Sequence, residues 1–132
     1  AKTVHACSKA ADRLAEMEIS ARVIDLRTLK PLDEETILNA ARKTGRVIVV
    51  HEASRMCGVG AEVSSLIAEK VFASLTAPVI RLTGPDAPAP ASFPLEQAFV
   101  PQPDAIVEAA IKLVDYGQTA VVRNLPAIAS AK

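Results

Sequence analysis

The sequence has no long apolar run and no net charge, and each absence excludes a class of protein. Its 15 Lys and Arg residues balance 15 Asp and Glu residues, without a basic cluster. Because phosphate binding needs a net or clustered positive field, we expect no nucleic-acid partner. No apolar run approaches the roughly 20 residues of a spanning helix, so we also expect no membrane partner.

Cysteine is scarce as well, with only Cys7 and Cys57 in 132 residues. Two cysteines are too few for a disulfide framework and lack the close spacing of a zinc site, so we expect reduced thiols. Residues 1–18 lack the charged and then apolar order of a signal peptide. We therefore expect a soluble intracellular protein, in the cytoplasm or, in a eukaryote, the mitochondrial matrix.

Helical and extended patterns alternate along the chain. Apolar residues that recur every three or four positions predict helices over about 3–18, 33–45, 60–74 and 103–117. Short apolar runs predict strands at 21–26, 46–50 and 78–82. Asp33 is placed to cap the start of the second helix, and Gly45 to end it.

The alternation predicts an α/β three-layer α/β/α sandwich with a mostly parallel sheet. The apolar run at 46–50 is typical of a strand covered on both faces. Six prolines between residues 85 and 103 predict a long surface loop. The chain opens with a helix, where such domains usually open with a strand, so we expect N-terminal strands to be missing. Residues 118–132 fit an edge strand or a tail equally well.

The turn after the second predicted strand contains residues that could form a small active or ligand-binding site. His51 and Glu52 follow the strand, and Gly58 and Gly60 precede a helix. Ligands of open α/β sheets bind beyond the carboxyl ends of strands, where these residues fall. A dinucleotide motif is incomplete, because Val63 stands where a third glycine belongs, and a Walker lysine is absent.

A Cys57 nucleophile activated by His51 is chemically imaginable near a helix N-terminus. No third residue orients such a pair, and a lone cysteine is usually a small buried hydrophobe. We therefore interpret both residues, and His5, as structural. Glu52 with Arg55 is interpreted as a solvated ion pair or a loop clamp. We assign no catalytic, cofactor-binding or metal-binding residue.

Four motifs in register carry a resemblance to a known family. They are Asp-Leu-Arg-Thr-Leu-x-Pro-Leu-Asp at 25–33, His-Glu-Ala at 51–53, Gly-x-Gly-Ala-Glu at 58–62 and Gly-Pro-Asp-x-Pro at 84–88. Over about residues 3–115 the chain resembles the C-terminal domain of transketolase-type β subunits. These subunits belong to the thiamin-diphosphate-dependent component of 2-oxo acid dehydrogenases, which act on pyruvate or on branched-chain acids such as 2-oxoisovalerate.

The resemblance implies a five-stranded mixed sheet, two strands of which normally precede the first helix of this chain. It therefore predicts an N-terminally truncated domain over 1–117 and a tail or edge strand over 118–132. Residues 119–124 are one candidate for a substitute strand. Pairing of the exposed edges with another copy of the chain is the other.

The resemblance also implies where the chemistry lies. In this family thiamin diphosphate and magnesium are held between the α subunit and the N-terminal domain of the β subunit, which supplies the catalytic glutamate and histidine. No motif of that domain is present, so this chain should bind no cofactor alone and hold no complete active site. The implied role is assembly into an α2β2 heterotetramer with the α subunit and a second β subunit.

Docking of the subunit-binding domain of the acyltransferase core is a second implied role. Such docking partners are basic, so Asp104, Glu108 and Asp115 are candidates for complementary charge, with plain solvated acids as the alternative. Two other functions stay open. One is the same domain in a sugar ketol-transferase or an acetoin-cleaving enzyme, although the His-Glu-Ala and Gly-Pro-Asp runs favour the oxo acid branch. The other is a stand-alone anion-binding module that uses the His51 turn.

Overall fold

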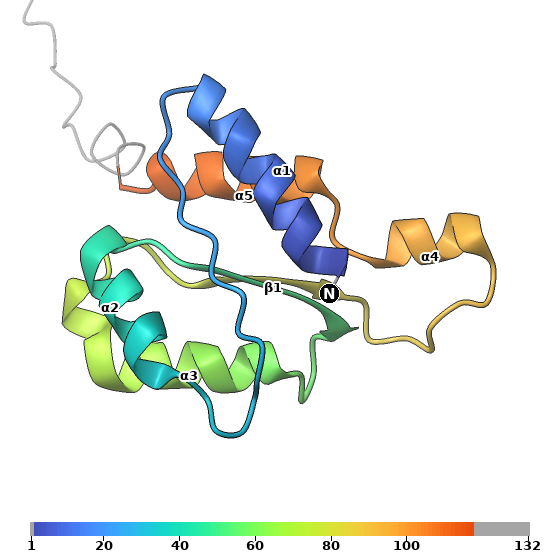
Figure 1. Ribbon diagram of the computed structural model, residues 1–132, viewed down its shortest axis with the longest axis horizontal. Coiled ribbons are helices and arrows are strands. Elements are labelled where there is room, and N and C mark those ends of the chain that lie inside the picture. The colour runs from blue at the N-terminus through green and yellow to red at the C-terminus, as the bar shows by residue number, and fades with distance from the viewer. Residues whose placement is uncertain (1, 118–132) are drawn as a thin grey trace, which may run out of the picture.

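Helices form two layers around a small sheet in the computed structural model, which describes residues 2–117 (Figure 1). Helices α1 (Lys2–Glu16) and α5 (Pro103–Val114) pack together on one face. Helices α2 (Glu34–Thr44) and α3 (Val59–Val71) pack together on the other. The predicted three-layer α/β/α arrangement is confirmed.

The sheet consists of strands β1 (Ile48–Ser54) and β2 (Ile80–Gly84), which pair in parallel. Ile48 lies opposite Ile80, and the Ile80 amide donates to the Val47 carbonyl at 3.1 Å. The strands predicted at 46–50 and 78–82 are therefore confirmed, as is their parallel pairing. The described residues form two strands, where the resemblance implies five.

The strand predicted at 21–26 is absent, so that prediction was wrong. The segment keeps the alternation of a strand, because Ile24 and Leu26 are half-buried while Val23 and Asp25 are exposed. No backbone hydrogen bond joins it to another segment within residues 2–117. A strand needs its backbone groups paired with a neighbour. The pattern is present, but no described strand lies beside it to pair.

The proline-rich loop is interrupted by helix α4 (Phe93–Phe99), which the sequence did not predict. Pro94 lies in its first turn, where the missing N–H removes no helical hydrogen bond. The prolines therefore limit the length of this helix without preventing it. A short 3-10 turn, η1 (Phe72–Ser74), extends α3. The tail or edge strand expected at 118–132 lies outside the described residues.

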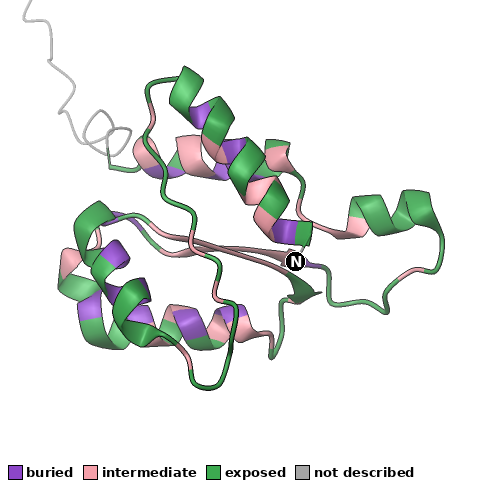
Figure 2. Cartoon of the chain, viewed as in Figure 1, coloured by how far each residue is buried: buried purple, intermediate pink, exposed green. Residues whose placement is uncertain are grey.

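Each layer of helices has its own core, and Figure 2 shows the buried positions among exposed residues along the main helices. On the α2 and α3 side Ile67 is fully buried and packs with Ile37 and Val63. On the other side Leu14 of α1 packs with Ile106 of α5. These two apolar clusters hold the helices against opposite faces of β1.

The predicted ends of α2 are both confirmed. The Asp33 carboxylate accepts a hydrogen bond from the Thr36 amide at 3.0 Å, which satisfies one free N–H of the first turn. Gly45 ends the helix with φ of +64°, a left-handed conformation that favours glycine. None of the helices within residues 2–117 is long and apolar enough to span a membrane.

Candidate functional site

Strand β1 continues to Ser54, so His51 and Glu52 lie inside the strand and not beyond its carboxyl end as expected. Consecutive strand residues point to opposite faces of a sheet. His51 accordingly lies against the start of α3, while Glu52 lines a cleft beside α1. The structure therefore separates these two polar side chains, and they form no common site.

The imidazole of His51 fills the space at the start of α3, beside Gly58 and Gly60. A Cβ atom at Gly60 would lie 2.5 Å from Nε2 of His51, and one at Gly58 would lie 2.7 Å from Cε1. Real Cβ atoms do not approach neighbours so closely, which makes glycine necessary at both positions. The glycines thus accommodate a side chain of the same chain, and the turn offers no open phosphate cradle.

Both ring nitrogens of His51 are shielded from solvent and have no hydrogen-bond partner among the described residues. Burial lowers the pKa of His51 below its ordinary value, and the positive charge of Arg81 acts in the same direction. The backbone of Ala53 opposes this shift, although its geometry falls short of a hydrogen bond. His51 is therefore held as a neutral, unpaired ring.

The turn that follows β1 is tied to β2 by reciprocal hydrogen bonds. Arg55 donates to the Arg81 carbonyl at 3.0 Å, and Arg81 donates to the Arg55 carbonyl at 3.2 Å. The Met56 amide donates to the Asp86 carboxylate at 2.8 Å. Within residues 2–117 Arg55 forms no ion pair with Glu52, and Arg55 holds the loop through the Arg81 carbonyl and not through Glu52.

Cys57 and His51 do not form a catalytic pair in this arrangement. Cys57 is exposed, with φ of +55°, while the nitrogens of His51 are enclosed and bond to nothing described. Residues 2–117 also contain no group of three or more His, Cys, Asp or Glu that could hold a metal ion. The described residues therefore offer no such cluster for magnesium, and the His51 ring fills the turn where a diphosphate would lie.

Two of the three candidate docking acids already have cationic partners. Asp104 accepts a hydrogen bond from Arg13 of α1. Glu108 pairs with Lys112 one turn later at 2.7 Å, and this hydrogen bond lowers the pKa of the Glu108 carboxyl. Asp115 is exposed at the end of α5 and forms no ion pair with a described residue. Asp115 is thus the acid most open to a partner.

A cleft of about 720 Å³ between α1 and α4 was not anticipated from the sequence. Lys2, His5 and Lys9 line it from α1, and Glu52 and Glu96 line it as well. The only signal in the sequence is the helical spacing of the three basic residues. The two carboxylates balance the two lysines, and Lys2 lies 4.0 Å from Glu96. This charge balance gives no clear preference for an anion.

Comparison with known proteins agrees with the fold. Residues 1–106 match the family described as "Transketolase, C-terminal domain", and the chain belongs to this family. A solved structure titled "Split gene transketolase, inactive beta4 tetramer" has a TM-score of 0.70 and 28% identity, covering 84% of this chain and 35% of that one.

Curated relatives include the beta subunits of dehydrogenases and of an acetoin oxidoreductase. The 2-oxoisovalerate dehydrogenase subunit beta of Pseudomonas aeruginosa is 48% identical over 84% of this chain and 30% of its own length. The mitochondrial pyruvate dehydrogenase E1 component subunit beta of Dictyostelium discoideum is 44% identical over 83% of this chain and 31% of its own length. The beta subunit of acetoin:2,6-dichlorophenolindophenol oxidoreductase of Bacillus subtilis is 40% identical over 86% of this chain and 33% of its own length. The chain spans about a third of the length of these relatives.

The contact between His51 and Gly60 predicts that the effect of Gly60→Ala on the free energy of unfolding depends on the residue at position 51. Gly60→Ala should lower the free energy of unfolding by about 1–3 kcal/mol, because the new methyl group meets the imidazole. In a His51→Ala background the same change should cost much less, because only Val49 Cγ1 at 3.3 Å still meets the new methyl group and alanine favours a helix. Denaturant unfolding of the four proteins measures this coupling. Equal effects of Gly60→Ala in both backgrounds would contradict the contact.

The lowered pKa of His51 predicts a pH dependence of stability. Its folded-state pKa lies below the unfolded value of about 6.5, so its contribution is complete above pH 6.5. That contribution is lost as the pH falls through the folded-state pKa, because the unfolded chain binds the proton more tightly. Between pH 7.5 and 5, His51→Leu should lose less stability than the parent. Identical pH profiles for the two proteins would refute this role.

Proposed function

We propose that this chain is the assembly and partner-docking domain of a β subunit of a 2-oxo acid dehydrogenase. The full complex would carry out oxidative decarboxylation of a 2-oxo acid and acyl transfer to lipoamide. The observation that carries the proposal is the 48% identity to such a β subunit across 84% of the chain. The closed turn at His51 favours it over a stand-alone anion-binding module, because the imidazole fills the place where an anion would bind.

The proposal assigns the cofactors to other parts of the complex. Thiamin diphosphate and magnesium would be held between the α subunit and the other domain of the β subunit. The described residues support this division, since they bring together no metal-ligating group. The chain would act in the cytoplasm of a bacterium or in the mitochondrial matrix of a eukaryote.

The choice of substrate would also lie outside this domain. Relatives named for pyruvate, 2-oxoisovalerate and acetoin match at 44%, 48% and 40% identity, so this chain is similar to all three to nearly the same degree. A domain that contacted the substrate would differ more between branches. This similarity favours a shared structural task, and it gives the oxo acid branch only a small advantage over acetoin cleavage.

Helix α4 supports an assembly role. None of its residues is buried, and Phe93 and Leu95 are 71% and 59% exposed. It projects from the body of the domain (Figure 1) and is held by Phe99, which lies against Gly84. Exposed apolar side chains on a projecting helix are typical of a surface that another subunit covers. We assign this surface to the contact between β subunits in an α2β2 heterotetramer.

Removing the apolar side chains of α4 tests the assembly role. Phe93→Ser combined with Leu95→Ser should raise the dissociation constant of the native assembly at least about tenfold, because exposed aromatic anchors dominate interface energies. Phe72→Ser is the matched control, since Phe72 is 72% exposed but lies on η1. Sedimentation of the native complex measures both. An equal loss with the control variant, or no loss with the α4 variant, would refute the assignment.

Charge reversal tests the docking role. Replacing Asp104, Glu108 and Asp115 with lysine should weaken binding of the acyltransferase subunit-binding domain at least about tenfold at low salt, and less at high salt. Asp115→Lys alone should account for most of the loss, because the other two acids have cationic partners. Asp12→Lys, at an exposed acid of α1, is the control. Unchanged binding after the triple reversal would show that the patch is misassigned.

A further inference from the structure

The loop that leads from the segment 19–26 into α2 is exposed at its tip and held at both ends. Residues 27–31 are all exposed, and Leu29 keeps 60% of its surface open to solvent. Leu26 and Leu32, on either side of the tip, pack against the core cluster of α2 and α3. The body of the domain therefore fixes where the tip lies without covering it.

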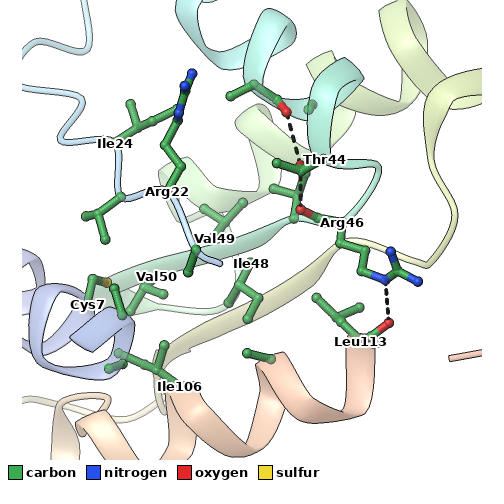
Figure 3. A pocket seen from close by; sticks show the side chains of 18 of the residues that line it. Cys7, Arg22, Ile24, Thr44, Arg46, Ile48, Val49, Val50, Ile106 and Leu113 are labelled. Carbon is green, nitrogen blue, oxygen red and sulfur yellow. Dashed lines mark hydrogen bonds between the residues drawn. The ribbon is translucent and has the colours of Figure 1, made fainter. Parts of the chain in front are cut away.

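The segment before the loop is also held against the domain. Figure 3 shows Ile24 at the apolar cavity of about 540 Å³ beside β1, and Leu26 lines the same cavity. Ile24 and Leu26 are half-buried, whereas the exposed stretch begins at Arg27. The change from covered to exposed side chains thus falls at a single residue.

Arg27 stands at a backbone position that favours glycine. Its φ is +58°, in the left-handed region, and among the described residues other than glycine only Glu18 and Cys57 also have a positive φ. A residue with a Cβ atom is disfavoured there, and such residues cluster at functional sites. The Asp25 carboxylate accepts a hydrogen bond from the Arg27 amide at 3.3 Å. Glycine could donate the same bond, so the turn itself does not require arginine.

The guanidinium group of Arg27 has donors that no described residue uses. Its Nε lies 2.9 Å from Oδ2 of Asp25, whereas its two Nη groups have no ion-pair partner within residues 2–117. The Arg27 side chain is 84% exposed, and an exposed ion pair contributes little to stability. The pair does restrain the planar group, so less conformational entropy is lost when the free donors bind a partner.

The tip beyond Arg27 is closed by a hydrogen bond of its own. The Thr28 hydroxyl donates to the Pro31 carbonyl at 3.0 Å, across the turn that contains Leu29. Leu29 is thus an exposed apolar side chain on a restrained backbone. Arginine is enriched among the anchors of protein interfaces, and an apolar neighbour on a preformed loop adds area that a partner can bury.

We propose that residues 27–31 form a docking loop for a subunit of a different kind, whose carboxylate binds Arg27 and whose surface covers Leu29. A planar guanidinium with free donors fits a carboxylate, with which it forms two hydrogen bonds. The apolar neighbour favours a protein surface over a small anion, because an anion would leave Leu29 uncovered.

The position of the loop distinguishes this contact from the one assigned to α4. Figure 1 shows the loop on the side of the sheet away from α5 and well apart from α4. The contact between copies of the chain is assigned to α4, so the docking loop serves a second and unlike partner. The inference rests on the proposed function, because it requires an assembly of subunits.

Substitution of Arg27 in the full polypeptide separates binding from folding. Arg27→Gly should leave the free energy of unfolding unchanged or raise it, because glycine favours the left-handed backbone. The same change should raise the dissociation constant of the native assembly at least about tenfold, because the partner's carboxylate loses its donors. Denaturant unfolding and sedimentation measure the two quantities. If the dissociation constant is unchanged, or rises only in step with a loss of stability, the proposal fails.

Matched variants test what the loop recognises. Arg27→Lys keeps the charge but lacks the planar fork, so it should reproduce most of the loss of assembly. Arg42→Lys makes the same change at an exposed arginine of α2 and should leave assembly unchanged. Leu29→Ser should weaken assembly without lowering the free energy of unfolding, because Leu29 is exposed. Equal effects of the two lysine variants would contradict the proposal.

A photo-crosslinking residue in place of Leu29 identifies the partner. In the native assembly it should join this polypeptide to one of a different kind, and Arg27→Glu should suppress the crosslink. A crosslink within the same polypeptide or to a second copy would overturn the proposal. If the unmodified polypeptide sediments alone, the proposed function fails as well. If it assembles and the Arg27 variants assemble equally well, only the docking loop is refuted.

Discussion

The close contact between the His51 imidazole and the two glycines at the start of α3 is the constraint on which the rest of the structure depends. It brings α3 against β1, because a side chain at Gly58 or Gly60 would hold the helix away. It also fills the position where a sheet of this class would admit a phosphate group. One contact therefore fixes the packing of the helix and removes the most obvious ligand site.

With the His51 turn closed, the described residues still present other open features. An apolar cavity of about 540 Å³ lies beside Ile48 and Val50. Helix α4 exposes Phe93 and Leu95, and Asp115 is an acid without an intramolecular cation among the described residues. Under the proposed function, these surfaces would hold other parts of a larger enzyme together, while the chain itself belongs to the transketolase C-terminal domain family.

Local features of the fold could be predicted from the sequence, because their causes lie within a few residues. The caps at Asp33 and Gly45 and the apolar runs that form β1 and β2 belong to this group. The strand predicted at 21–26 was wrong because strand pairing depends on a neighbouring strand, which no local pattern reveals. Helix α4 was missed because prolines were counted without regard to their position, and Pro94 is tolerated in a first turn.

The candidate site was harder to predict, because the roles of its residues depend on contacts between residues that are distant in sequence. The residues of the His51 turn were identified, but the sequence did not show what the glycines make room for. Only the folded arrangement places the ring against them. Among the docking acids, the Lys112 partner of Glu108 could be predicted from its helical spacing. The Arg13 partner of Asp104 lies 91 residues away and could not.

The most direct test of the account is the intact mass of the native polypeptide that carries this sequence, isolated together with whatever it binds. The account predicts a polypeptide two to three times heavier than the 13.9 kDa of this chain, accompanied by a larger subunit and an acyltransferase. A 13.9 kDa species that arrives alone and binds phosphate at the His51 turn would contradict it.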